Sequence, residues 1–370
     1  MLAAFGGEQG SSVQVVEPAT PAAASAAAAG SRQQLGGSEG QEPQAVDATE
    51  AAAAAGAGAL LPSQPACLDA PMHLMRVRSI PSWANAGFLG ASLSSLVCGN
   101  IRWILIQNAM LDLPWLLSAC PDLHRAERIL LVSHRPWLAK KAKVEEGAKP
   151  RTLQARERKL ADVRALGLED RASVYEPAIG GHGTNHSKFF LVDYERGMRV
   201  IIMSANAVFS DCNNKTQVLF TQDFPRKDEQ SPKTSAFEGA LEAYIRELRM
   251  PCGPTLHLVQ LIRSCDFSAA RGHLVASVPG RHKGADLHKW GHMRMRAVLC
   301  QEAFPARFRG APLAAQMSSL GLLNERWLVR EFRYSLAAGL CEGGTDVLGL
   351  PANGPLGLQL VYPTVEEVDD

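Results

Sequence analysis

The sequence lacks a long apolar run and a recognisable secretory signal. Its most apolar uninterrupted stretch, 51–61, is eleven residues of mostly Ala and Gly and ends at Pro62. A helix that crosses a bilayer needs about 20 apolar residues. The N-terminus also has no basic segment followed by an apolar one, which is the pattern of a signal peptide. We therefore expect no membrane span and no membrane partner.

Closely spaced cysteines are also absent. The eight cysteines are scattered, and no two of them form a Cys-x-x-Cys pair. A disulfide framework in a small secreted domain normally shows dense, regularly spaced cysteines. The pattern predicts reduced thiols inside a cell.

The chain has little net charge, but the charge is unevenly distributed. There are 38 Lys and Arg against 37 Asp and Glu, a formal net charge of +1. Residues 1–66 contain six acidic residues and a single basic one, Arg32, so the net charge of 67–370 is +6. This mildly basic remainder permits a polyanionic partner without requiring one.

The composition changes near Cys67. Residues 1–66 are a low-complexity mixture of Ala tracts, Gly, Gln and Ser, which cannot bury enough apolar area to offset the entropy of ordering. We expect a disordered Ala/Gly-rich tail there. From about Cys67, short runs of Ile, Val and Leu alternate with amphipathic stretches, which indicates a sheet covered by helices.

Several elements can be predicted from the periodicity of apolar residues. The segments 129–133 and 273–277 are interpreted as buried strands, and 234–249 as an amphipathic helix. The charged stretch 139–170 is interpreted as exposed helix and loop, because a run of charges is usually a solvated face.

One segment, 181–206, has a density of polar residues that core packing does not explain. Two apolar strand-like runs, 189–192 and 200–203, flank Glu195-Arg196-Gly197. A three-residue loop that ends in a left-handed glycine predicts a hairpin. Pairing Tyr194 with Met198 would place Lys188 opposite Ser204 and His186 opposite Asn206.

That hairpin would bring three kinds of polar group together. Residues at i and i+2 of a strand share a face, as do directly paired residues, so His186, Lys188 and Asn206 would converge. An imidazole, an ammonium and an amide suit a phosphate, with His as nucleophile or acid/base and the others as counter-charge and donor. Gln217, which precedes another apolar run, adds a fourth polar group.

Two simpler interpretations compete with this one. A lone His-x-Lys at a strand end is often a surface feature. Zinc binding by His182, His186 and Cys212 is disfavoured, because the i, i+4 spacing suits a helix, the segment is interpreted as loop and strand, and a fourth ligand is missing. We expect no metal.

His186-x-Lys188 with an Asn twenty residues after the His resembles half of the active-site signature of the phospholipase D superfamily. Longer blocks are similar to the tyrosyl-DNA phosphodiesterase family in particular, and they follow the family's order over about 75–365. The matching blocks are 186–190, 194–202, 204–206, 211–217, 278–282, 289–294, 316–321 and 361–366.

The resemblance implies a phospholipase D-like α/β fold, a mixed sheet flanked by helices on both faces in an α-β-α sandwich, preceded by the disordered tail. Residues 67–355 would form the first catalytic half-domain, and 356–370 would begin a truncated second half-domain. It also implies a metal-independent phosphodiesterase of DNA repair that needs no cofactor. The substrates would be 3′ ends of single-stranded or duplex DNA that carry topoisomerase I-derived tyrosyl peptides or other 3′ blocking groups.

By matching position, His186 would attack phosphorus and form a covalent phosphohistidine. Lys188, Asn206 and Gln217 would hold the non-bridging oxygens as charge develops in the transition state. The residues implied to contact DNA are Ser318, Ser319, Gly321 and His182. The resemblance also implies a monomer in the nucleus, with the cytoplasm as a second location.

The sequence departs from the family pattern in three places. His182 and Ala109 stand where larger aromatic rings are expected, which weakens base stacking. Of the ten histidines, only His186 has Lys two residues later, whereas the family uses two such motifs. We therefore expect a truncated chain that lacks the general acid, whose loss costs about 10²–10⁴-fold in rate.

Two alternatives remain open. One is a non-catalytic module that binds DNA ends, for which DNA binding does not depend on His186. The other is a different phospholipase D-type enzyme, such as a nuclease; a lipid hydrolase should show an apolar interfacial stretch, and none is visible outside the expected core.

Overall fold

The computed structural model describes most of the chain from residue 71 onward. The described ranges are 71–85, 91–133, 151–177, 185–228, 233–308, 312–317, 324–340 and 358–362. The tail predicted over 1–66 lies outside them, as does most of the second half-domain predicted over 356–370.

Seven strands in these ranges form one mixed sheet in the order β1-β7-β6-β5-β2-β3-β4. β2, β3 and β4 are parallel to one another, and the remaining neighbours pair antiparallel. The predicted strand over 129–133 is confirmed as β3. The strands are β1 (Met72–Leu74), β2 (Trp103–Asn108), β3 (Arg128–Ser133), β4 (Ala172–Tyr175), β5 (Phe189–Tyr194), β6 (Gly197–Met203) and β7 (Val218–Pro225).

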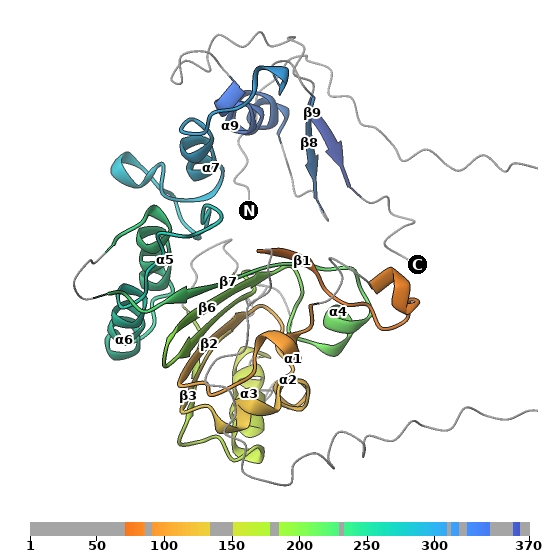
Figure 1. Ribbon diagram of the computed structural model, residues 1–370, viewed down its shortest axis with the longest axis vertical. Coiled ribbons are helices and arrows are strands. Elements are labelled where there is room, and N and C mark those ends of the chain that lie inside the picture. The colour runs from red at the N-terminus through yellow and green to blue at the C-terminus, as the bar shows by residue number, and fades with distance from the viewer. Residues whose placement is uncertain are drawn as a thin grey trace, which may run out of the picture.

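Helices cover both faces of this sheet, which confirms the predicted mixed α-β-α sandwich. Figure 1 shows α5 and α6 on one side and α1, α2 and α3 on the other. α3 lies within the predicted charged stretch, whose first part is outside the described ranges. The helices are α1 (Leu93–Leu96), α2 (Leu113–Ala119), α3 (Arg151–Ala165), α4 (Phe209–Asn213), α5 (Ala236–Glu247) and α6 (Cys252–Arg263).

Local capping explains where two of these helices begin. Asp112 Oδ1 accepts a hydrogen bond from the Trp115 backbone N–H at 3.1 Å, and Pro114 occupies the first turn of α2. Ser235 Oγ accepts a hydrogen bond from the Glu238 backbone N–H at 3.2 Å, so Ser235 caps α5, which begins at Ala236. The predicted helix over 234–249 is confirmed as α5.

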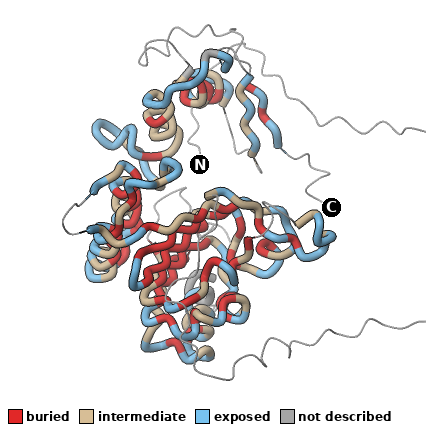
Figure 2. The backbone as a smooth tube through the Cα atoms, in the orientation of Figure 1, coloured by how far each residue is buried: buried red, intermediate tan, exposed pale blue. Residues whose placement is uncertain are grey.

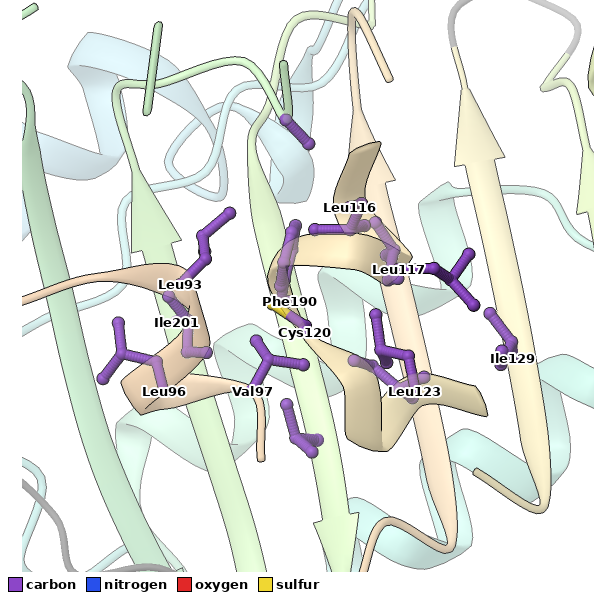
Figure 3. Packing of buried hydrophobic residues seen from close by; sticks show 14 of the residues in the cluster. Leu93, Leu96, Val97, Leu116, Leu117, Cys120, Leu123, Ile129, Phe190 and Ile201 are labelled. Atoms are coloured by element: carbon purple, nitrogen blue, oxygen red, sulfur yellow. The ribbon is translucent and has the colours of Figure 1, made fainter. Parts of the chain in front are cut away.

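The first core lies between the sheet and helices α1, α2 and α3. Phe190 and Ile201 of the central strands face it, because successive side chains of a strand alternate between faces. Figure 3 shows Leu96 and Leu116 lying over the strands that carry these two residues. Full burial of a Leu or Phe side chain contributes about 1.5–3 kcal/mol, so this layer stabilises the sheet strongly.

The second core lies between the opposite sheet face and helices α5 and α6. Phe189 and Leu191 of β5 face it, one position out of phase with the residues that face the first core. Buried aromatic rings are more numerous here than in the first core, and the ring centroids of Phe224 and Phe237 are 5.5 Å apart. Figure 2 shows that buried residues gather in the central strands, which both cores share.

The predicted hairpin is confirmed as β5 and β6, but its predicted register is wrong by one residue. Tyr194 pairs with Gly197 and Asp193 pairs with Met198, so the loop contains two residues instead of three. A one-residue shift changes which side chains lie opposite one another along the whole ladder.

Gly197 is a glycine for a different reason from the predicted one, which was a left-handed conformation at the end of the loop. It is the first residue of β6 and pairs with Pro225 of β7. A Cβ atom at Gly197 would lie 2.3 Å from the backbone oxygen of Phe224, far inside contact distance. Glycine is therefore required because β7 approaches the hairpin closely at this point.

The predicted buried strand over 273–277 is wrong. The segment is irregular, with Leu274 and Ala276 partly buried against the second core and Val275 38% exposed. A segment that packs one side against a core has the same apolar content as a strand. This one pairs with none of the seven strands of the sheet.

The C-terminal part of the described chain packs around a smaller apolar cluster. His292 Nδ1 lies 2.9 Å from Ser335 Oγ and links two of its helices. Within the described ranges, no helix has the length and apolar character that a membrane crossing requires. The elements are α7 (Gly291–Leu299), α8 (Glu325–Trp327), α9 (Arg333–Leu336) and the parallel pair β8 (Leu313–Gln316) and β9 (Leu358–Val361).

Replacing Gly197 by alanine should destabilise the fold by about 1–3 kcal/mol, because the new methyl group forces β6 and β7 apart. Gly239→Ala is the matched control, because Gly239 lies on the exposed side of α5 with open space around it. That variant should be more stable by about 0.5–1 kcal/mol. Urea unfolding measures both, and equal effects at the two sites would contradict this explanation of Gly197.

Candidate active site

One end of the sheet collects the predicted phosphate-binding residues. The antiparallel pairing puts Gln107 at the end of β2 opposite Phe189, and Met203 at the end of β6 opposite Leu219. The loops that enter β5 and β7 therefore lie beside the loop that leaves β6, with neighbouring strands about 5 Å apart. The residues contributed by these loops are His186, Lys188, Asn206 and Gln217.

His186 and Lys188 are in direct contact. Lys188 Nζ lies 3.1 Å from His186 Nδ1 and donates to the His186 carbonyl oxygen at 3.0 Å. The imidazole is exposed, whereas Lys188 is only 7% exposed. Burial lowers the pKa of Lys188, although the nearby Asp211 carboxylate acts in the opposite direction. An ammonium with little hydration next to an exposed imidazole suits an anionic ligand.

The corrected register changes the neighbours of this pair. The Lys188 carbonyl accepts a hydrogen bond from the Met203 backbone N–H at 3.0 Å, so the predicted pairing of Lys188 with Ser204 is wrong. The predicted pairing of His186 with Asn206 is wrong for the same reason. β6 ends at Met203, and Asn206 lies in the loop that leads into α4.

Asn206 is held by Asp211 of α4. Its backbone N–H and its side-chain Nδ2 both donate to Asp211 Oδ2, at 3.1 and 2.8 Å, and Lys215 Nζ donates to Asp211 Oδ1 at 2.8 Å. Burial acts to raise the pKa of Asp211, but the hydrogen bonds from Lys215 and Asn206 outweigh it and hold the pKa below its ordinary value. α4 thus orients the Asn206 amide, which is predicted to bind phosphate.

Gln217 is oriented by Ser204. Ser204 Oγ donates to Gln217 Oε1 at 2.5 Å and accepts from the Val218 backbone N–H at 2.9 Å. Because the amide oxygen of Gln217 is engaged in this way, its NH₂ group is the end that can donate to a ligand. The Ser204 backbone N–H also donates to the Val218 carbonyl at 2.9 Å, which joins the loop after β6 to the start of β7.

Four of the predicted site residues lie outside the described ranges. They are His182, Ser318, Ser319 and Gly321, so their predicted DNA contacts stay predictions. Ala109 is described, and it directly follows β2 at the same end of the sheet.

The structure argues against Cys212 as a metal ligand. Its thiol is buried and donates to the Asn206 carbonyl at 3.2 Å, and burial raises its pKa to about 12. A thiol must lose its proton to bind zinc. Within the described ranges, no three His, Cys, Asp or Glu side chains gather as a metal site would need.

The roles of Asp211 and Ser204 were not predicted from the sequence. The spacing of Asp211 and Lys215, four residues apart near a helix, is a recognisable ion-pair signal. The contact of Ser204 with Gln217 joins residues thirteen positions apart and had no local signal.

The tautomer of His186 is a first test of this geometry. While Lys188 is protonated it donates to Nδ1, so a neutral imidazole must carry its proton on Nε2. Nitrogen-15 shifts of the His186 ring in the ligand-free chain should report the Nε2–H form. The Nδ1–H form would show that Lys188 is not the donor.

Asp211→Asn should make the free energy of unfolding less dependent on pH in the acid range. The folded state favours the ionised carboxylate of Asp211, so the pKa of this group is lower in the folded chain than in the unfolded chain. The ionised carboxylate therefore contributes its full stabilisation above the unfolded pKa, and this stabilisation is lost as the pH falls through the folded pKa. Urea unfolding between pH 7 and pH 3 should show a steeper loss for the wild type than for the variant. Parallel profiles would contradict the role of Asp211.

Comparison with known proteins agrees with the resemblance found in the sequence. A family model described as tyrosyl-DNA phosphodiesterase matches residues 72–370. Tyrosyl-DNA phosphodiesterase 1 of Arabidopsis thaliana is 33% identical over 312 residues, which cover 81% of this chain and 47% of that protein. The Drosophila melanogaster protein of the same name is 32% identical over 197 residues, 50% of this chain and 32% of that protein.

A solved structure of the yeast tyrosyl-DNA phosphodiesterase is similar at a TM-score of 0.47 and 15% identity, covering 68% of this chain and 52% of that one. The chain spans about half the length of the Arabidopsis relative, and less of the Drosophila one. The family model covers most of the chain, including every described residue of the candidate site. The chain belongs to the tyrosyl-DNA phosphodiesterase family.

Proposed function

We propose that this chain acts on phosphodiesters at DNA 3′ ends, with His186 as the nucleophile. A bond forms between an imidazole nitrogen and phosphorus, and the bond from phosphorus to the tyrosyl oxygen or other 3′ adduct breaks. Water then hydrolyses the phosphohistidine and restores the ring. The observation that carries the proposal is the exposed His186 imidazole 3.1 Å from the buried Lys188 ammonium.

The neighbouring donors stabilise the charge that develops on the phosphate oxygens. Lys188 supplies a positive charge with little competing water, and the NH₂ groups of Asn206 and Gln217 supply directed N–H donors. Donors of this kind accelerate a reaction only when they bind the transition state more tightly than the substrate.

The contact between Lys188 and His186 sets the order of events. Attack through Nε2 needs the proton on Nδ1, the position that Lys188 occupies in the ligand-free structure. An arriving phosphate draws the ammonium toward its own oxygens, and Nδ1 is then free to take the proton. Substrate binding therefore activates the nucleophile.

The proposal extends to the substrate and the surroundings of the site. The substrate is the 3′ end of single-stranded or duplex DNA that carries a topoisomerase I-derived peptide, and the chain acts as a monomer in the nucleus without a metal. Ser318, Ser319, Gly321 and His182 contact the DNA. Because His186 is the only His followed two residues later by Lys, slow departure of tyrosine is expected from this chain.

A substrate with an activated leaving group gives the sharpest test. An oligonucleotide with a 3′-(4-nitrophenyl) phosphate releases a phenolate that needs no proton from the enzyme. Incubation in a chelator should release 4-nitrophenolate and leave an acid-labile adduct on His186, found by peptide mapping.

Variants separate chemistry from binding in this test. His186→Ala should abolish the adduct and keep DNA binding, whereas His124→Ala, which removes an exposed histidine outside the site, should behave as the wild type. DNA binding without an adduct in the wild type would instead support a DNA-end binding module. Cleavage of internal phosphodiesters would support a nuclease.

A further inference from the structure

A buried polar network lies under the segment that carries His186 and Lys188. Gln107 Nε2 donates to Asn185 Oδ1 at 2.5 Å, and Tyr244 Oη is hydrogen-bonded to Gln107 Oε1 at 2.9 Å and to Ser187 Oγ at 2.7 Å. Gln107 is 0%, Tyr244 7% and Asn185 9% exposed. We infer that Tyr244 and Gln107 are positioning residues, which hold Asn185 and Ser187 and thereby fix the direction of the His186 and Lys188 side chains.

The alternation of side chains along the chain supports this inference. Asn185 and Ser187 alternate with His186 and Lys188, and they reach the face covered by α5, where Phe189 also points. Lys188 interacts electrostatically with Asp211 of α4, which belongs to the opposite face. Anchoring Asn185 and Ser187 on one face therefore sets the orientation of the His186–Lys188 pair on the other.

The backbone in this segment needs such an anchor. The ladder of β5 begins at Phe189, and before it the segment is tied to β6 through the Lys188 carbonyl. A rotation of 185–188 about its own axis would turn the imidazole away from the site. Two side-chain hydrogen bonds, from Asn185 to Gln107 of β2 and from Ser187 to Tyr244 of α5, oppose that rotation, and the bond between Tyr244 and Gln107 holds the two anchors together.

Tyr244 is a rigid anchor for this purpose. Its ring packs edge-on against Phe189, with the centroids 6.1 Å apart at 81°. Burial raises the pKa of Tyr244, so its hydroxyl remains protonated and can donate throughout the working range of pH. Buried polar groups are costly unless they are hydrogen-bonded, and an apolar residue at Gln107 would pack there without that requirement.

This inference rests on the proposed function, and the test uses a matched pair of tyrosines. Tyr244→Phe keeps the ring packing and removes the hydroxyl. Tyr194→Phe is the control, because its buried hydroxyl donates to the Cys98 carbonyl at 3.0 Å and it lies at the far end of β5. Both variants lose one buried hydroxyl from the same structural unit, so both should lose a similar amount of stability.

Single-turnover release of 4-nitrophenolate from the activated oligonucleotide separates positioning from folding. Tyr244→Phe should lower the maximal rate about 10- to 100-fold and leave the half-saturating DNA concentration unchanged, because a misplaced reacting group affects the chemical step. Tyr194→Phe should keep the wild-type rate. Ser187→Ala should reduce the rate as well, and adding it to Tyr244→Phe should have little further effect, because both remove the same bond.

A readout without substrate keeps this inference apart from the proposed function. Nitrogen-15 signals of the His186 ring should shift and broaden in Tyr244→Phe and stay unchanged in Tyr194→Phe. A wild type that forms no His186 adduct would overturn the proposed function and leave the ring signals as the test of positioning. Equal rates or unchanged ring signals in Tyr244→Phe and the wild type would overturn the positioning role.

Discussion

The ladder between β5 and β6 determines where each polar group of the candidate site lies. It ends at the Lys188 carbonyl and the Met203 N–H, and the other polar groups of the candidate site lie in the loops directly beyond. Because β7 and β2 flank this hairpin antiparallel, their own loops arrive at the same end of the sheet. Gly197 makes this arrangement possible by letting β7 approach the hairpin without a clash.

Charge balance is the second constraint on the site. Lys188 is buried, which disfavours its ammonium form, and the carboxylate of Asp211 compensates for part of that loss. Asp211 in turn is satisfied by Asn206 and Lys215. The positive charge of Lys188 is therefore partly balanced within the protein itself.

The two faces of the sheet contribute differently to the candidate site. On one face, α4 supplies Asp211, which orients Asn206. On the other, α5 supplies Tyr244, which contacts Ser187 and Gln107. The segment 185–188 lies between these faces and interacts with a residue of each helix, Tyr244 of α5 and Asp211 of α4.

Elements that depend on a single local signal were predicted correctly from the sequence. The strand over 129–133, the helix over 234–249 and the hairpin follow from periodicity and turn residues, which act over a few positions. The register failed because Gly197 has two possible uses, a left-handed turn or a close approach, and only the position of Phe224 distinguishes them. The strand predicted over 273–277 failed because apolar content does not reveal whether a ladder partner is available.

The sequence alone identified the α/β class from the periodicity of apolar residues and the family from its motifs. It also predicted the contact between His186 and Lys188, because residues two positions apart along a strand share a face. The partner of Gln217 and the network under His186 follow from the fold. They join residues that are up to 137 positions apart, such as Gln107 and Tyr244. Such contacts depend on how the strands pair and how the helices pack on the sheet, and no spacing along the chain encodes them.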